Sequence, residues 1–311
     1  MAEALDATGD AGGHAFRKTA PHMKTRTLGK TGLTVSLLGL GCGPLGDEGL
    51  EEREVTRLIH GALELGVTVF DTARSYGLSE ERLGRALTGR RARAVVSTKV
   101  GYGIDGFEDW TGPCVTAGID AALSRLQTDW LDVVHLHSCG LETLRRGEVI
   151  EALQAAQRQG KVRVVAYAGD NEALQWALES GRFGAVQCSV NVCDQVALHT
   201  QVDEAQRRGL GVLAKRAAAN SVWRSTTAQP ELYRERYRRM GLSDGGFDSL
   251  DLALRFSAFA PGVDCALVGT TRLSHLEQNV RSVERGPLEA GIISTLRGTF
   301  LEHGTGWRAQ T

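Results

Sequence analysis

Ionisable side chains follow three successive apolar stretches of the sequence, where they could form one reaction centre. Asp71 and Tyr76 come at the end of one stretch, and Lys99 lies at the end of the next. His137 ends the third. A charged side chain behind an apolar strand is costly to bury unless it is paired, so Asp71 and Lys99 are expected to face each other.

These residue types are suited to proton transfer. A phenol has a reference pKa of about 10, and a nearby ammonium group lowers it by favouring the phenolate. Lys99 would supply that charge to Tyr76. His137 could donate a hydrogen bond to the oxygen atom that Tyr76 protonates, orienting a carbonyl group and stabilising the alkoxide that forms on hydride arrival. Each residue alone also has a structural interpretation, but their joint occurrence favours the chemical one.

A second histidine lies close to this centre. Alternation along a strand places His135 on the same side as His137, one layer deeper. A two-histidine metal site would need a third ligand, and no convincing spacing supplies one. His135 is therefore interpreted as a core histidine, and no metal is predicted.

Short apolar stretches alternate with longer amphipathic segments from Thr34 onward, a pattern typical of βα units with a parallel sheet. The predicted strands are 34–41, 67–73, 94–100, 131–138, 162–169, 185–191, 211–217 and 265–271. The predicted helices are 51–65, 79–88, 115–127, 143–159, 171–181, 201–208, 247–259 and 273–282. Eight such units predict an α/β fold, a single-domain (β/α)₈ TIM barrel, whose reactive groups sit at the carboxyl ends of the strands.

The alternative fold is a doubly wound sheet of the Rossmann type, which would carry G-x-G-x-x-G after its first strand. The glycines at 39–43 are followed by Pro44 and a loop, so the spacing does not fit. We interpret them as a turn that lets the chain pass close to a ligand or another strand. The segment 218–246 is predicted as a long functional loop.

From residue 23 onward the sequence resembles the aldo-keto reductase superfamily. The matching motifs are the opening at 24–41, Asp-Thr-Ala at 71–73 with Tyr-Gly at 76–77, Ser-Thr-Lys at 97–99, and 131–137. The resemblance implies a catalytic tetrad of Asp71, Tyr76, Lys99 and His137, with Tyr76 as general acid and hydride from a bound nicotinamide.

The resemblance also implies residues that bind the nicotinamide. The family holds its amide with a Ser-Asn pair after the fifth strand and a Gln on the sixth, which here is Gln187. Ala168 stands at the serine position, so Asp170 and Asn171 are candidates to replace the lost contacts. The usual stacking aromatic on the seventh strand is absent, and Lys215 or Arg216 could lie over the ring or reach the pyrophosphate.

The eighth predicted strand and its helix match the family segment that holds the adenosine part of the cofactor. Backbone groups at a helix start also favour a phosphate there. NADP(H) is favoured on family grounds, with Arg272 as a substitute for the usual basic residue, and NAD(H) stays open. The candidate residues in this segment are Gly269, Thr270, Thr271, Arg272, His275, Gln278 and Asn279.

The composition is that of an ordinary globular protein. The chain has 311 residues, 42% of them hydrophobic and 23% charged, with a formal net charge of −1, so nucleic acid and anionic membranes are not expected partners. Its six scattered cysteines are predicted to be free thiols in a reducing cytoplasm. Residues 1–22 are interpreted as a flexible extension and 23–311 as the barrel domain. The expected partner is a small-molecule carbonyl substrate, and the protein is expected to be a monomer or small homo-oligomer.

Two other functions remain open at this stage. A nicotinamide-binding regulatory or scaffold protein with little turnover would fit the altered cofactor contacts. A barrel lyase or hydrolase would use Lys99 as a Schiff-base nucleophile. An apolar wall for the substrate is predicted from five side chains in the loops, namely Leu45, Tyr102, Trp110, Cys139 and Trp223.

Overall fold

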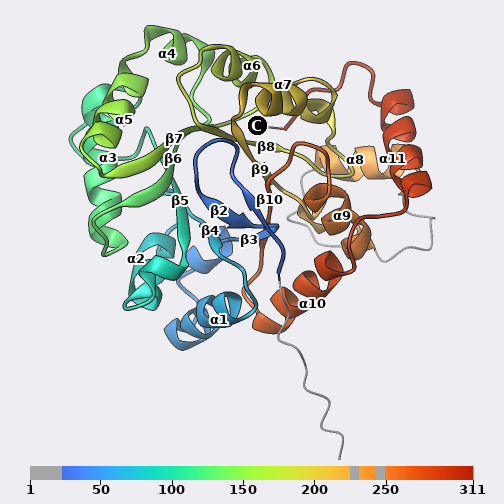
Figure 1. Ribbon diagram of the computed structural model, residues 1–311, viewed down its shortest axis with the longest axis horizontal. Coiled ribbons are helices and arrows are strands. Elements are labelled where there is room, and N and C mark those ends of the chain that lie inside the picture. The colour runs from blue at the N-terminus through green and yellow to red at the C-terminus, as the bar shows by residue number, and fades with distance from the viewer. Residues whose placement is uncertain (1–22, 225–230, 243–248, 311) are drawn as a thin grey trace, which may run out of the picture.

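The computed structural model describes residues 23–224, 231–242 and 249–310. Eight parallel strands close into a barrel in the order β10-β3-β4-β5-β6-β7-β8-β9, which confirms the predicted fold. Helices surround the barrel on the outside (Figure 1). The barrel strands are β3 (Leu38–Gly41), β4 (Val69–Asp71), β5 (Val95–Val100), β6 (Leu131–His137), β7 (Val162–Ala168), β8 (Ala185–Ser189), β9 (Gly211–Lys215) and β10 (Cys265–Gly269).

A hairpin of β1 (Thr25–Thr27) and β2 (Thr34–Ser36) precedes the barrel. The predicted strand 34–41 is therefore two strands, divided at Leu37. The hairpin bonds to residues just before β9 and β10, because Lys30 N donates to Gly209 O and Gly29 N to the Asp264 carboxylate. Its fully buried Leu28 packs into the apolar interior of the barrel. The hairpin thus closes the end of the barrel opposite the strand carboxyl ends.

The outer helices agree with the predicted ones in most positions. One predicted helix, 143–159, is two helices, because Gly147 adopts a left-handed φ of 82° between them. Another begins at Gly112 instead of 115, with the Thr111 hydroxyl accepting from Cys114 N. The helices are α1 (Glu52–Glu64), α2 (Ser79–Leu87), α3 (Gly112–Arg125), α4 (Leu141–Arg146), α5 (Glu148–Arg158), α6 (Asn171–Glu179), α7 (Gln201–Arg208), α9 (Ser249–Ala258) and α10 (Leu273–Glu284).

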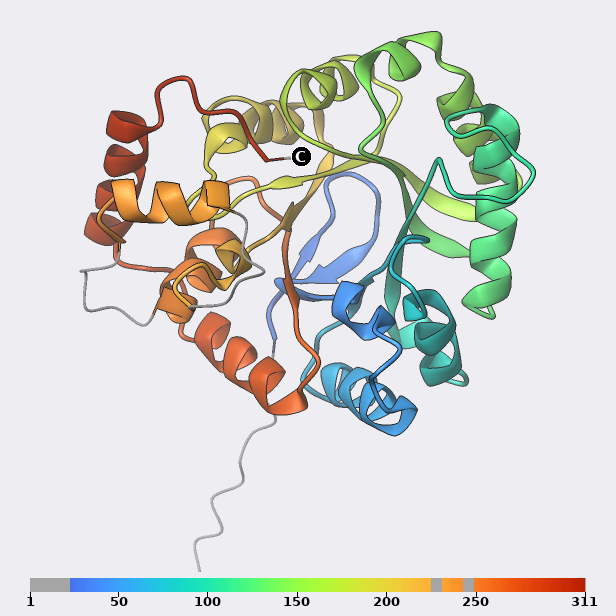
Figure 2. The same cartoon turned by 180° about the vertical axis from the view of Figure 1, so that it is seen from behind.

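Two helices were not expected. α8 (Glu231–Arg239) lies inside the predicted loop 218–246, and α11 (Ala290–His303) follows the last barrel helix. After α11 the chain turns back from the periphery and ends over the barrel near β8 (Figures 1 and 2). Short 3₁₀ turns occur at η1 (Gly43–Gly46), η2 (Arg91–Arg93), η3 (Val196–His199) and η4 (Ala219–Ser221).

Among the described residues no helix is long and apolar enough to cross a membrane. The predicted extension at 1–22 lies outside the described residues, as do 225–230 and 243–248 of the predicted loop.

Candidate active site

The predicted ion pair forms at the carboxyl ends of β4 and β5. Lys99 Nζ lies 2.7 Å from Asp71 Oδ2 and donates to Thr72 O at 2.9 Å. The other carboxylate oxygen of Asp71 accepts from Ser97 Oγ at 2.8 Å and from Gln187 Nε2 at 2.9 Å. Both ions are almost fully buried. The charges of this cluster therefore depend on each other.

The electrostatics keep both members of the pair ionised. Burial alone would raise the pKa of Asp71, but the charge of Lys99 and the hydrogen bonds outweigh it, so the pKa is lowered. Burial alone would lower the pKa of Lys99, but the carboxylate of Asp71 outweighs it, so the pKa is raised. A fixed positive charge thus sits at this end of the barrel.

Tyr76 lies beside that charge, in the loop between β4 and α2. Lys99 Nζ is 5.1 Å from the centre of the Tyr76 ring. The loop is fixed by two glycines in close contact: a Cβ on Gly46 would lie 1.7 Å from Tyr76 O, and Gly77 has a φ of 51°. Gly43 faces the Tyr76 ring. Of the glycines at 39–43, Gly39 is the one that permits a close approach, because a Cβ there would lie 2.7 Å from Leu267 Cδ2 on β10.

The pKa of Tyr76 differs from the sequence-based expectation. Burial raises it, and although the charge of Lys99 acts in the opposite direction, the carboxylate of Asp71 adds to the increase. The net shift is upward, so the phenol stays protonated at neutral pH.

His137 completes the group of four. Its ring stands edge-on to Tyr76, with 6.1 Å between ring centres and an interplanar angle of 88°. Burial, with a smaller effect of the charge of Lys99, lowers the pKa of His137 to about 4. His135 lies deeper and is fully buried, with Nε2 3.1 Å from Ser97 Oγ. Burial lowers its pKa to about 3. Within the described ranges no cluster of potential ligands could hold a metal ion.

A cavity of about 600 Å³ opens over this group. All four predicted catalytic residues line it, together with Gln187, Lys215, Arg216 and Gly269 of the predicted cofactor residues. The five side chains predicted as an apolar wall are not among its lining residues. Polar groups that sequence reasoning missed take their place, namely Ser138, Asn220 and Ser221. Each follows a barrel strand directly or within a few residues, which is the position that could have indicated them.

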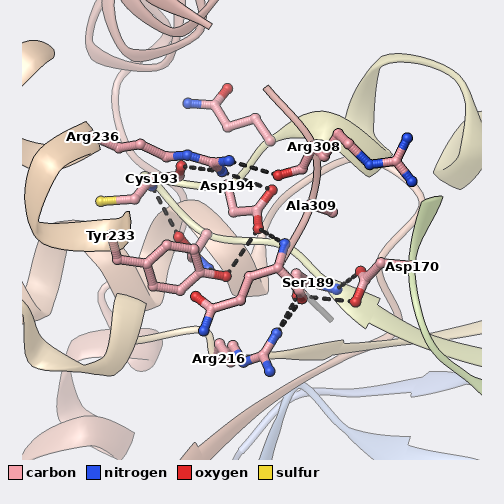
Figure 3. A network of polar contacts seen from close by, with 12 residues as sticks. Asp170, Ser189, Cys193, Asp194, Arg216, Tyr233, Arg236, Arg308 and Ala309 are labelled. Atoms are coloured by element: carbon pink, nitrogen blue, oxygen red, sulfur yellow. Dashed lines mark hydrogen bonds and ion pairs between the residues drawn. The ribbon is translucent and has the colours of Figure 1, made fainter. Parts of the chain in front are cut away.

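Three predicted cofactor residues, Asp170, Asn171 and Lys215, are engaged with other parts of the protein. Figure 3 shows Asp170 and Arg216, another of the predicted residues, both bonded to Ser189. The buried carboxylate of Asp170 accepts from Ser189 N at 2.8 Å and pairs with Lys215 Nζ at 2.8 Å. The side chain of Asn171 bonds the backbone N and O of Ala309, each at 3.0 Å. Asp170 and Asn171 are not among the residues that line the cavity. From this segment it is Ala168 that lines the cavity.

Arg216 borders the cavity and also contacts the end of the chain. Its guanidinium donates to Ser189 Oγ at 2.9 Å and to the backbone oxygen of Gln310. Lys215 is held by Asp170, so neither cation is unrestrained. Two tethered cations therefore lie at the end of β9, where the sequence lacks the expected aromatic residue.

The segment after β10 begins at the cavity and then leaves it. A Cβ on Gly269 would press on Pro44 at 3.2 Å, so a glycine keeps this rim narrow. Arg272 is exposed and precedes α10, and Thr270 Oγ1 accepts from its backbone N at 3.2 Å. Along α10, Asn279 is 3% exposed, and its Oδ1 has no hydrogen-bond partner among the described residues. Thr271, His275 and Gln278 lie along the same segment outside the cavity lining.

The structure is a closed (β/α)₈ barrel with a buried ion pair, a phenol and an imidazole around one cavity. The model of the aldo/keto reductase family matches residues 37–298. The chain belongs to this family, and its resemblance from the sequence motifs is confirmed.

Individual relatives agree with the family assignment. L-galactose dehydrogenase of Arabidopsis thaliana is 30% identical over 284 residues, covering 84% of this chain and 88% of that protein. Methylglyoxal reductase YeaE of Escherichia coli is 30% identical over 54% of this chain and 56% of that protein. The holo form of an aldo-keto reductase from Bacillus halodurans superposes with a TM-score of 0.78 at 27% identity, over 89% of this chain and 96% of that one.

Proposed function

We propose that this protein reduces aldehydes or ketones of small molecules to alcohols with a nicotinamide cofactor, and that Tyr76 is the general acid. The observation that carries the proposal is the convergence of Asp71, Tyr76, Lys99 and His137 on one cavity, with Lys99 held 2.7 Å from Asp71. These are the groups needed to protonate an oxygen atom and stabilise the charge that develops on it.

Each residue has a distinct role in this proposal. Tyr76 is protonated at neutral pH because burial raises its pKa, so it can give its proton to the substrate oxygen. The ammonium of Lys99 stabilises the phenolate that remains. Asp71 keeps Lys99 charged. His137 is neutral near pH 7 and borders the same cavity, where its free nitrogen can donate a hydrogen bond to the oxygen.

The described residues fit a nicotinamide dinucleotide, and NADP(H) is the form we favour. Gln187, Lys215 and Arg216 line the cavity and would hold the amide and the pyrophosphate. The buried Oδ1 of Asn279 has no hydrogen-bond partner within the described ranges and would accept from an adenine amino group. The exposed Arg272 would bind a 2′-phosphate. When bound, the cofactor would supply the hydride that reaches the carbonyl carbon.

The polar lining supports substrates that carry hydroxyl groups. Ser138, Asn220 and Ser221 offer hydrogen bonds around the cavity, and a relative over most of the chain is named for L-galactose. Short hydroxyaldehydes are therefore proposed as better substrates than aromatic aldehydes.

The six buried, free cysteines support a reducing cytoplasm as the location.

The Schiff-base alternative loses support at Lys99. A nucleophilic lysine must be a neutral amine, whereas this one is ion-paired and its pKa is raised. Borohydride treatment in the presence of a competent substrate should leave Lys99 unmodified.

The first experiment is a fluorescence titration with NADPH and with NADH, followed by nicotinamide absorbance after adding glyceraldehyde or 4-nitrobenzaldehyde. Turnover with both aldehydes, faster with glyceraldehyde, is expected. Tyr76→Phe should bind NADPH like the parent but lose activity by on the order of hundredfold. Tyr237→Phe, which removes a phenol outside the cavity, is the matched control. Equal turnover by Tyr76→Phe would refute the assigned acid, and binding without any turnover would favour a regulatory protein.

A further inference from the structure

Tyr102 is fixed next to the proposed active site by the loop that follows β5. Gly101 has a φ of 133°, and the Trp110 ring fills the place of its missing side chain, since a Cβ there would lie 2.3 Å from that ring. Trp110 N also donates to Gly101 O at 2.7 Å. The rings of Tyr102 and Trp110 are 5.5 Å apart. The position of the Tyr102 hydroxyl is therefore set by packing, and not by the cavity.

That hydroxyl lies against the far side of His137. Tyr102 Oη is 2.8 Å from His137 Nδ1 and 3.1 Å from Ser75 Oγ. The Tyr102 and His137 rings are 5.5 Å apart at an interplanar angle of 25°. The other ring nitrogen of His137, Nε2, makes no hydrogen bond to any described residue, while the ring borders the cavity. The two nitrogens therefore have different surroundings.

A neutral imidazole carries one N–H proton. The nitrogen that holds this proton decides whether a donor or a lone pair faces the cavity. Because burial and the charge of Lys99 keep His137 neutral near pH 7, it has only one N–H to place. If the proton is on Nδ1, then Nε2 presents a lone pair and would repel a carbonyl oxygen. If the proton is on Nε2, the same nitrogen donates to that oxygen.

The acidities of the neighbouring groups favour the second arrangement. A phenol, with a reference pKa of about 10, is the strongest neutral donor of the three groups in the chain Ser75–Tyr102–His137. An imidazole nitrogen is their strongest acceptor. The phenol then donates to Nδ1. Ser75 Oγ is a second possible acceptor for the phenol proton, but it lies 3.1 Å away against 2.8 Å for Nδ1, and it is exposed to water, so Nδ1 is the stronger acceptor.

We propose that Tyr102 is a positioning residue that holds His137 as the Nε2–H tautomer, so that a neutral histidine presents a hydrogen-bond donor to the substrate oxygen. This inference rests on the proposed function for its consequence, but not for the tautomer itself. Tyr102 is not among the residues that line the cavity. It acts through the imidazole.

The direct test is long-range proton–nitrogen NMR of the histidine side chains at pH 7.5, without substrate. The His137 signal is assigned by its loss in His137→Asn. The parent should show the Nε2–H tautomer, and Tyr102→Phe, which keeps the ring and loses the hydroxyl, should show a mixture or the Nδ1–H form. A parent that shows Nδ1–H, or a variant with the parental tautomer, would overturn the proposal.

Kinetics give a second measurement. Tyr102→Phe should lower kcat for aldehyde reduction by about tenfold or more, with KM and NADPH binding near the parental values, because only the polarising hydrogen bond weakens. Ser75→Ala is the matched control, since it removes the other contact of the same hydroxyl and should keep both the tautomer and most of kcat. Equal losses of kcat in the two variants would contradict the assignment.

The two proposals can fail separately. If no aldehyde is turned over but the tautomer follows Tyr102, the function is wrong and the positioning role stands. If turnover is normal and the tautomer is the same in Tyr102→Phe as in the parent, the proposed function stands and the positioning role of Tyr102 is wrong. Melting temperatures of both variants show whether the fold is intact.

Discussion

Asp71 is the residue on which the charges of the site depend. Its carboxylate receives hydrogen bonds from Lys99 and Ser97 on β5 and from Gln187 on β8. Because it holds Lys99 as a cation, it also controls the charge beside Tyr76. Gln187 was predicted from family resemblance to bind the cofactor amide. Here one N–H of its amide is donated to Asp71, so the other N–H and the oxygen remain for that contact.

The buried pair predicts a large and asymmetric effect on stability. Asp71→Asn should lower the free energy of unfolding by about 3–5 kcal/mol, because it leaves the ammonium of Lys99 buried without a counter-ion. The double variant with Lys99→Met should recover most of that loss. Urea unfolding at pH 7 measures both.

A surface pair provides the control for this prediction. Asp120 pairs with Lys161, but its side chain is 51% exposed. Asp120→Asn should cost at most about 1 kcal/mol. If Asp71→Asn lowers the free energy of unfolding by no more than Asp120→Asn does, the buried pair does not stabilise the fold more than a surface pair.

At the level of elements, the barrel strands could be predicted because each is a short apolar stretch between amphipathic segments. α8 could not, since its nine residues include four arginines and its burial depends on Tyr233, Arg236 and Tyr237. α11 buries only Leu296 and Phe300, too few for a helical pattern. Local sequence predicts an element when its apolar face is continuous, and these two helices lack one.

The site shows the same division. The pairing of Asp71 with Lys99 follows from adjacent strands, so it could be predicted. The upward pKa shift of Tyr76 could not, because it comes from burial by the surrounding loops.

The contact between η1 and the Tyr76 loop yields a prediction for an element. A Cβ at position 46 would lie 1.7 Å from Tyr76 O, so Gly46→Ala must displace one of the two segments. A displacement of about 1 Å at a reacting group lowers turnover by on the order of hundredfold. Turnover of glyceraldehyde measures it. Gly140→Ala, where a Cβ meets nothing within 4 Å, should behave like the parent. Parental turnover by Gly46→Ala would show that Tyr76 does not need this contact.

For the whole molecule, the end of the chain joins elements that are far apart in sequence. We call residues 308–310 the C-terminal strap. Arg236 Nη2 donates to Arg308 O at 2.6 Å, and Gln310 N donates to Asp194 Oδ2 at 2.9 Å. The Asn171 partner, Ala309, is 138 residues away. No local pattern could have indicated that this asparagine binds the strap.

The strap should contribute to global stability through its backbone and not through its surface charge. Ending the chain at Trp307 leaves the buried Arg236 and Asp194 without these partners. Burial already raises the pKa of Asp194, so the loss of a donor makes its carboxylate still more costly. The free energy of unfolding, measured in urea, should fall by about 2–5 kcal/mol. Several hydrogen bonds of about 1 kcal/mol each are lost, and the polar groups left without partners add a further cost.

Arg308→Ala separates the two contributions, because it removes only the exposed ion pair with Glu172 and keeps the backbone bonds. It should cost less than about 1 kcal/mol. The truncated chain should also bind NADPH with altered affinity, since Arg216 loses the oxygen of Gln310 that holds it at the cavity. If truncation and Arg308→Ala unfold at the same urea concentration, the backbone contacts of the strap carry no stability. The loops, and not the strap, would then hold this side of the barrel closed.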